Sequence, residues 1–257
     1  MSKSRVATDH KERFSNRVTH YAKYRPRYPD AILNFMKEQL NLSPASVIAD
    51  IGSGTGILSE MFLRNGNLLF GVEPNKEMRE AAESFLAAYT NFRNINGSAE
   101  STTLPACSVD FVTAGQSFHW FDQTKAKEEF LRILRPRGWV VLVWNTRRRS
   151  TPFLQAYEKL VHDYGRDYQQ VRHENLGGNT LANFLAGHKA KTFDNFQLLD
   201  YQGLVGRLLS SSYTPLPGDP RHDPMLAELR RIFDFFQSDG FVRLEYDTEV
   251  HYGQLGE

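Results

Sequence analysis

Three glycines at alternate positions could bring a ligand against bare backbone. Gly52, Gly54 and Gly56 are separated by Ser53 and Thr55, and they follow a short apolar run. Glycine has no Cβ, so such a turn bends tightly and approaches a ligand closely. A helix that starts after the turn would direct its first amide groups at the same ligand. The spacing differs from the Gly-x-Gly-x-x-Gly pattern of dinucleotide sites, and an ordinary strand–turn–helix corner is the alternative interpretation.

Two carboxylates accompany the glycines. Asp50 stands just before Gly52, and Glu73 ends the next apolar run, 17 residues after Gly56. In a Rossmann-like nucleoside site, an acid at the end of the second strand accepts hydrogen bonds from both ribose hydroxyls. Glu73 by itself would more simply be a solvated carboxylate at a strand end. Together with the glycine turn, it favours a nucleoside-binding site.

A family resemblance is carried by three segments. Residues 47–56 resemble motif I of class I methyltransferases, in which the methionine part of S-adenosylmethionine crosses the glycines. Residues 97–112 (GSAESTTLPACSVDFV) are similar to the adenine-binding segment of the type 11 methyltransferases. Residues 130–145 (FLRILRPRGWVVLVWN) are similar to the helix, turn and strand that follow it. In that family the loop acid holds the adenine amino group, so the resemblance assigns this role to Glu100, with the backbone of Ala99 beside it.

The segment 114–121 (AGQSFHWF) resembles the trans-aconitate methyltransferase-like branch of this family. It follows an apolar strand, and open α/β sheets bind ligands beyond the carboxyl ends of their strands. The resemblance implies that Gln116 and Ser117 border the cofactor, while His119 and Trp120 face the substrate or pack beside it. His119 is the candidate general base. A structural role for the His-Trp pair is the alternative.

The N-terminal segment 21–29 (YAKYRPRYP) also resembles that branch, where it forms a lid over the cofactor. Arg25 could then pair with the cofactor carboxylate through charge-assisted hydrogen bonds. Tyr21, Tyr24 or Tyr28 could present a ring face or hydroxyl near the sulfonium. For the basic residues between 3 and 17, a solvated arm is the simpler interpretation.

The predicted sites combine these observations. The predicted cofactor contacts are Tyr21, Arg25, Asp50, Gly52, Ser53, Gly54, Thr55, Gly56, Glu73, Pro74, Asn75, Met78, Ser98, Ala99, Glu100, Gln116 and Ser117. The predicted substrate contacts are Tyr28, His119, Trp120, Trp144 and Arg147. No metal site is predicted.

Repeated strand–helix alternation must position these residues. Short apolar strands are predicted at 47–51, 68–72, 109–114 and 139–144, with amphipathic helices starting near 30, 58, 78 and 126. A turn is expected at 135–138. This alternation predicts a parallel sheet with right-handed crossovers. The resemblance implies a Rossmann-like, seven-stranded, mostly parallel sheet with helices on both faces and an antiparallel last strand.

The second half of the chain is less regular. Residues 146–192 are polar and aromatic, and we expect helices and a loop that cover the sheet edge and select the acceptor. A strand at 196–201, a long turn at 210–220, a helix at 225–236 and a half-exposed strand at 244–252 should follow. The predicted organisation is an N-terminal lid and helical segment at 1–40, then a methyltransferase domain at 41–257 with 146–192 inserted in it.

Composition restricts the class of protein. The 257 residues include 31 basic and 30 acidic side chains, for a formal net charge of +1, which argues against a polyanionic partner. Cys107 is the only cysteine, so neither an internal disulfide nor a thiolate metal cluster is expected. No signal-like segment or membrane-length apolar run occurs. We therefore expect a cytoplasmic protein without a membrane span, monomeric or homodimeric, with a small molecule rather than nucleic acid as its substrate.

The resulting prediction is methyl transfer from S-adenosylmethionine to oxygen or carbon of a small molecule, such as a carboxylic acid. In-line displacement requires mainly that the protein positions the acceptor against the methyl group. A carboxylate acceptor carries no proton to be removed, so it needs no general base. Three alternatives stay open: a non-catalytic S-adenosylmethionine-binding module, an RNA methyltransferase that uses the basic arm, and a nicotinamide-dependent oxidoreductase. The last lacks its glycine spacing.

Overall fold

The computed structural model describes residues 23–166 and 179–256. Its strands are β1 (Val47–Ile51), β2 (Leu68–Val72), β3 (Phe92–Ile95), β4 (Val109–Gly115), β5 (Leu134–Arg147), β6 (Ala186–Leu199) and β7 (Val242–Gln254). The α-helices are α3 (Asp30–Leu40), α4 (Ile57–Arg64), α5 (Lys76–Phe85), α6 (Gln123–Ile133), α7 (Pro152–Tyr164), α8 (Thr180–Phe184), α9 (Tyr201–Leu209) and α10 (His222–Phe236). A 3₁₀ turn, η1, spans Phe118–Trp120. Tyr21 and the rest of residues 1–22 in the predicted N-terminal segment lie outside the described residues.

The strands form a seven-stranded sheet in the order β3-β2-β1-β4-β5-β7-β6. The pairs β1 with β2, β1 with β4, β2 with β3 and β4 with β5 are parallel. The last strands are antiparallel, which confirms the predicted Rossmann-like sheet. Chain reversal after β3 brings β4 beside β1, so the carboxyl ends of β1 and β4 are neighbours. This is where an open α/β sheet binds its ligand.

Contacts divide the chain into two compact units. Unit 1 contains residues 1–26, 146–175 and 194–247, and unit 2 contains residues 27–145, 176–193 and 248–257. In unit 2, alternate residues of the central strands enter two apolar clusters. Ala49 and Val112 belong to one, whereas Ile48 and Phe111 belong to the other. Strands buried on both faces need continuous apolar runs, which is why β1 and β4 were recognisable in the sequence.

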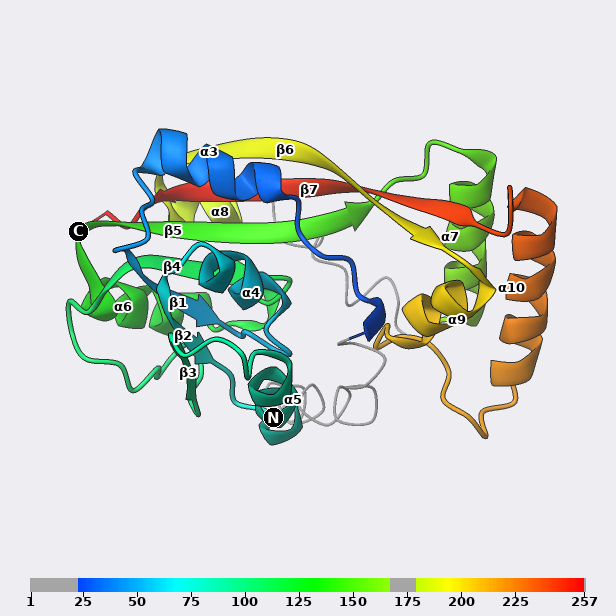
Figure 1. The fold of residues 1–257 in the computed structure, drawn as a ribbon, viewed down its shortest axis with the longest axis horizontal. Coiled ribbons are helices and arrows are strands. Elements are labelled where there is room, and N and C mark those ends of the chain that lie inside the picture. Colours follow the sequence, from blue (N-terminus) through cyan, green and yellow to red (C-terminus); the bar gives the residue numbers. More distant parts are fainter. Residues whose placement is uncertain (1–22, 167–178, 257) are drawn as a thin grey trace. The chain divides into compact units, whose positions relative to one another are not determined.

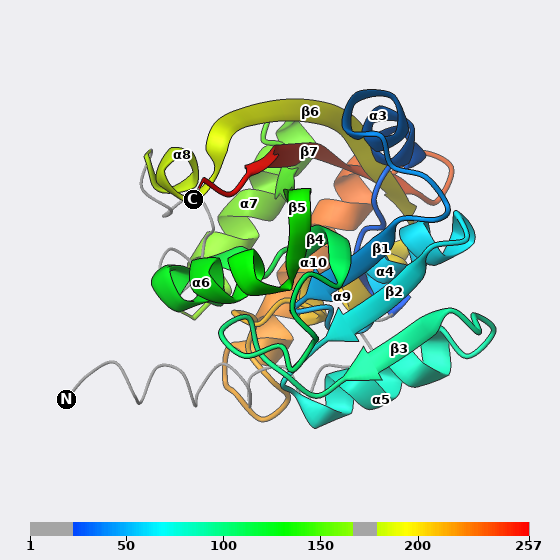
Figure 2. The ribbon, with the colours of Figure 1, turned by 90° about the vertical axis from the view of Figure 1, so that its left-hand side faces the viewer.

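Helices of unit 2 supply the other walls of these clusters. Phe130 of α6 packs with the first cluster, and Met36 of α3 and Met61 of α4 pack with the second. Helix α5 lies beside β3, as Figure 2 shows. In unit 1, α10 packs against α7 and α9 (Figure 1). Apolar side chains of these helices form a third cluster with Leu244 of β7.

Several predicted elements differ from the structure. The strand expected at 196–201 is the end of β6, which starts at Ala186, inside the segment for which helices and a loop were expected. The turn expected at 135–138 lies within β5, where Arg137 has φ +65° and the register against β4 shifts. The short strand β3 and the helix α9 were not predicted. The helix at α10 and the alternating strand at β7 are confirmed.

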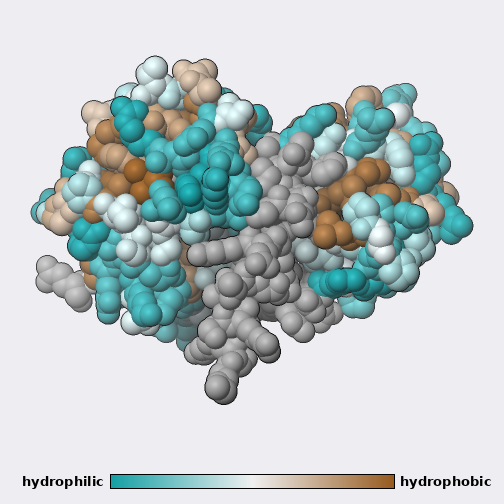
Figure 3. Space-filling model, turned by 90° about the horizontal axis from the view of Figure 1, so that it is seen from below, coloured by the Kyte–Doolittle hydropathy of each residue, from teal (hydrophilic) through white to brown (hydrophobic). Residues whose placement is uncertain are grey.

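The surface of each unit is mainly hydrophilic in the view of Figure 3, with smaller hydrophobic areas. The most exposed large apolar side chains are Phe235, 81% exposed, and Leu198, 61% exposed. None of the helices within 23–166 and 179–256 is long and apolar enough to cross a bilayer.

Candidate cofactor site

The glycine turn joins β1 to α4 and leaves open space above its middle glycine. Gly52, Gly54 and Gly56 all have positive φ, at +66°, +55° and +84°. A Cβ at Gly52 would lie 2.7 Å from the Cβ of Ser117, and one at Gly56 would lie 2.6 Å from Cδ1 of Leu86. A Cβ at Gly54 would meet no atom within 4 Å. Gly52 and Gly56 therefore permit packing within the protein, whereas Gly54 leaves room for a ligand.

Glu73 lies next to Gly54, as the sequence predicted. Its Oε2 accepts a hydrogen bond from the Gly54 amide at 3.0 Å, and its Oε1 accepts one from the Asn75 amide at 2.8 Å. Glu73 is buried, at 9% exposure. The two amides fix the carboxylate at the carboxyl end of β2, and a carboxylate can accept further hydrogen bonds at both oxygens. Asn75 in turn caps α5, because its Oδ1 accepts from the Met78 amide at 2.9 Å.

Two hydroxyls of the turn are buried without a hydrogen-bond partner among the described residues. They are the Oγ of Ser53 and the Oγ1 of Thr55. Buried hydroxyls are normally satisfied by protein, water or ligand. These two hydroxyls lie inside the turn, whereas the space above Gly54 and the carboxylate of Glu73 form the part that suits the polar groups of an adenosyl cofactor.

Asp50 has a different place from the one predicted. It is 0% exposed and accepts hydrogen bonds from Ser59 Oγ at 2.6 Å and Thr113 Oγ1 at 3.2 Å. Burial raises the pKa of Asp50 to about 7, although these hydrogen bonds act in the opposite direction. The carboxyl group thus joins β1, α4 and β4 beneath the turn, and we infer that it supports the turn rather than touching a ligand.

The segment after β4 packs against the glycine turn. Gln116 has φ +58°, and its amide donates to the Val143 carbonyl at 2.9 Å. Ser117 Oγ donates to the Ile51 carbonyl at 2.9 Å. The structure therefore places Ser117 beside Gly52, where it fixes the geometry of the turn.

The loop predicted to hold adenine forms a tight turn in which the backbones of Ser98 and Ser101 pair. Ala99 is buried, and Glu100 Oε1 accepts from the Asp122 amide at 2.9 Å. Sequence reasoning missed the group that anchors this loop. Glu129 Oε1 accepts from the Thr102 amide at 2.8 Å, and both its oxygens accept from the Arg132 guanidinium at 2.7 Å.

The predicted substrate residues fall in separate places. In unit 2, a Cβ at Gly115 would lie 2.7 Å from the Tyr28 hydroxyl, so this hydroxyl lies at the carboxyl end of β4. His119 and Trp120 follow on η1 with ring centroids 4.5 Å apart. Trp144 is 1% exposed and packs in the first cluster, which argues against the predicted substrate contact.

Two predicted residues, Arg25 and Arg147, belong to unit 1. Arg25 Nη2 donates to the Ser210 carbonyl at 3.0 Å. Arg147 forms an ion pair with Glu158, and its guanidinium lies 4.9 Å from the centre of the Tyr157 ring. These contacts hold both arginines inside unit 1.

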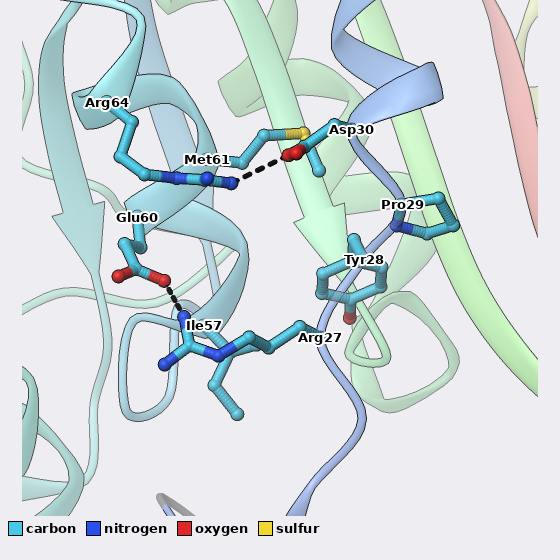
Figure 4. A pocket seen from close by; sticks show the side chains of 8 residues that line it. All are labelled: Arg27, Tyr28, Pro29, Asp30, Ile57, Glu60, Met61 and Arg64. Carbon is cyan, nitrogen blue, oxygen red and sulfur yellow. Dashed lines mark hydrogen bonds and ion pairs between the residues drawn. The ribbon is translucent and has the colours of Figure 1, made fainter. Parts of the chain in front are cut away.

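A cavity of about 330 Å³ lies in unit 2 beside Tyr28. Figure 4 shows two ion pairs in its wall, Arg27 with Glu60 and Arg64 with Asp30. Apolar lining comes from α4 and from the residue after Tyr28. Because both arginines of the wall are paired with carboxylates, the cavity has no evident preference for a charged ligand.

Comparison with known proteins agrees with this geometry. Residues 49–142 match a family model described as a methyltransferase domain. An uncharacterised methyltransferase-like protein of Schizosaccharomyces pombe is 30% identical over 158 residues, 60% of this chain and 59% of that protein. An uncharacterised methyltransferase of Mycobacterium tuberculosis is 33% identical over 161 residues, 62% of this chain and 61% of the relative. These matches show that the chain is similar to methyltransferases, with the family model confined to residues 49–142.

The similarity of residues 49–142 to a methyltransferase domain supports S-adenosylmethionine as the cofactor. The chain spans about three fifths of the length of the curated relatives it matches. Neither the relatives nor the family model identify the trans-aconitate branch.

Solved structures share the fold. One from Anaeromyxobacter dehalogenans, described provisionally as a type II methyltransferase, has a TM-score of 0.68 at 21% identity, covering 90% of this chain and 98% of that one. A phosphoethanolamine N-methyltransferase of Haemonchus contortus, solved with phosphomonomethylethanolamine and S-adenosylhomocysteine, has a TM-score of 0.53 at 13% identity. It covers 94% of this chain and 58% of that one.

Proposed function

We propose that this chain transfers the methyl group of S-adenosylmethionine to a small-molecule acceptor. The observation that carries the proposal is the open space at Gly54, with the fixed carboxylate of Glu73 beside it. The positive φ of Gly54 by itself favours glycine, so it is the combination of that open space with the carboxylate of Glu73 at hydrogen-bond distance that supports a ligand site. The methyltransferase domain match over residues 49–142 and the Haemonchus neighbour that holds S-adenosylhomocysteine support the same cofactor.

The residues present fit this cofactor. Glu73 would accept hydrogen bonds from the ribose hydroxyls, and the backbone at Gly54 would lie under the methionine part. The loop at Ala99 and Glu100 would border the adenine. When bound, the cofactor supplies a methyl group that is already activated on a sulfonium. The chain then needs to orient the acceptor in line with that methyl group and to exclude water.

The acceptor would approach from the carboxyl end of β4. The Tyr28 hydroxyl lies there, and η1 places His119 and Trp120 directly after the strand. We propose these three residues as acceptor contacts for O- or C-methylation. A carboxylate acceptor would react without a base, whereas a hydroxyl or an acidic carbon would use His119 to take its proton.

Calorimetric titration with S-adenosylhomocysteine tests the site through Glu73. We expect micromolar affinity for the unmodified protein, about −8 kcal/mol. The Glu73→Gln variant should bind about tenfold more weakly or worse, because hydrogen bonds to an ionised acceptor are replaced by weaker ones. Glu77→Gln is the matched control, since Glu77 is exposed in the first turn of α5. Equal affinity in Glu73→Gln and Glu77→Gln would remove Glu73 from the site.

Catalysis needs a separate measurement. Release of S-adenosylhomocysteine should be followed over a panel of small carboxylic acids, phenols and quinols, with transfer RNA as a further acceptor. Turnover with a small molecule is the expected result. Cofactor binding without turnover on any acceptor would favour a binding module, and turnover on RNA alone would contradict the proposed acceptor class.

A further inference from the structure

A buried arginine in unit 1 lies among hydroxyl groups instead of carboxylates. Arg207 of α9 is 4% exposed. Its Nε donates to the Tyr246 hydroxyl at 3.0 Å, and its Nη1 donates to Ser211 Oγ at 3.1 Å. Within residues 23–166 and 179–256, no carboxylate forms an ion pair with Arg207. A guanidinium removed from water without an anion is unfavourable, so this arrangement is not explained by stability.

A second hydroxyl near this charge is also buried. Tyr157 of α7 is 0% exposed, and its hydroxyl has no hydrogen-bond partner among the described residues. The charges of Arg207 and Arg147 both act on this phenol. Buried tyrosine hydroxyls usually find a partner. Tyr157 thus offers a donor close to two guanidinium groups.

The pKa of Tyr213 reflects the electrostatic potential near Arg207 and Arg147. Burial alone would raise the pKa of its phenol, but the charges of Arg147 and Arg207, with a smaller effect of Arg25, outweigh burial and lower this pKa to about 8. The environment therefore favours negative charge. Tyr213 itself is partly exposed at the surface of unit 1.

We propose that Arg207 and Tyr157 bind the oxyanion group, a carboxylate or a phosphate, of a small ligand in unit 1. Because Nε and Nη1 already donate to hydroxyls, Nη2 of the planar guanidinium fork would donate to one oxygen of either group, and the Tyr157 hydroxyl would donate to another. Arg147 adds positive charge, although Glu158 is its ion-pair partner. Occupancy of this site can be measured without S-adenosylmethionine, so its test does not depend on the proposed methyl transfer.

The test is calorimetric titration with succinate and with inorganic phosphate at constant ionic strength, with succinamide as the uncharged probe. We expect one or both anions to bind and succinamide not to bind. In Tyr157→Phe the affinity should fall about tenfold, the loss of one hydrogen bond to a charged group. Its melting temperature should not fall, since the hydroxyl that is removed has no described partner.

Tyr201→Phe is the matched control. Tyr201 also lies under a guanidinium, that of Arg230 at 4.6 Å, but Arg230 is paired with Asp234 at 2.8 Å. The affinity of the Tyr201→Phe variant for the anion should equal that of the unmodified protein. Arg207→Lys, which keeps the charge but loses the fork, should also bind more weakly.

The titrations distinguish a carboxylate site, a phosphate site and the absence of an anion site. Binding of succinate alone assigns a carboxylate ligand, and binding of phosphate alone assigns a phosphate ligand. Absence of binding by both anions would overturn the proposal, and so would equal affinity in Tyr157→Phe and Tyr201→Phe. If Arg207→Lys does not fold, the comparison of the two tyrosine variants still decides.

Discussion

Replacing Gly54 with alanine tests whether the space above the glycine turn belongs to the cofactor. The added methyl group would meet no protein atom within 4 Å, so packing is not disturbed. The only remaining cost to stability is the strain of the backbone conformation, because φ is +55° at this position and alanine disfavours positive φ. A left-handed conformation costs an L-residue about 1–2 kcal/mol. The free energy of unfolding should therefore fall by about that amount and no more.

Cofactor binding should suffer separately. If the ligand lies in van der Waals contact with the Gly54 backbone, an added methyl group forces it or the turn to move. Overpacking of this kind costs about 1–3 kcal/mol, which corresponds to roughly a tenfold to hundredfold rise in Kd. Calorimetric titration with S-adenosylhomocysteine measures this directly, and urea unfolding of the same preparation measures the stability.

Gly187→Ala is the matched control for the backbone. Gly187 has φ +63°, and a Cβ there would also meet nothing within 4 Å. Both variants should lose similar stability, but only Gly54→Ala should lose affinity. Gly56→Ala should unfold more easily than either, because its Cβ would lie 2.6 Å from Leu86 Cδ1. If Gly54→Ala and Gly187→Ala bound the ligand equally well, the space above Gly54 would not be the cofactor site.

Two further predictions concern pH. The pKa of Asp50 is raised from 3.8 to about 7, so its contribution to stability is complete below pH 3.8 and is lost as the pH rises to 7, by about 4 kcal/mol. Asp50→Asn should abolish this slope in urea unfolding, and an unchanged slope would contradict the buried proton. The pKa of Glu129 is lowered from 4.5 to about 2, chiefly by Arg132, so its contribution is lost as the pH falls from 4.5 to 2. Glu129→Gln should be less stable than the unmodified protein at pH 7 by about 3 kcal/mol and equally stable near pH 2. Equal stability at pH 7 would refute that effect.

The sequence pattern predicted the central elements because those strands are buried on both faces. The apolar runs gave β1 and β2 with the same bounds as the structure, and β4 to within one residue. Strand β3 escaped prediction because all four of its residues are partly or fully exposed and include Arg93 and Asn94. The first half of β6 is likewise mostly exposed, so its sequence shows no apolar period.

Helix α9 was missed for a different reason. It contains Gly203 and Gly206, which a sequence reading treats as helix breakers. A Cβ at Gly206 would lie 2.3 Å from the Tyr24 ring, so this glycine allows close packing within unit 1. Such a requirement comes from a residue more than 180 positions away and leaves no local signal.

The site was predictable where its residues are contiguous. The glycine turn and Glu73 meet as expected, because a strand, a turn and a helix determine their positions. The partners of Asp50 could not be predicted, since Thr113 reaches it across the sheet. The surroundings of Arg207 depend on three separate elements for the same reason.

The division of the chain into units has a practical consequence. Each unit consists of three separate stretches of sequence, and the backbone passes from one unit to the other at 26/27, 145/146, 175/176, 193/194 and 247/248. No single truncation can therefore isolate either unit, and one proteolytic cut cannot release it. A hybrid that exchanges either unit with that of a relative would need several grafted segments with matched junctions, so the roles of single residues are more simply tested by point substitutions.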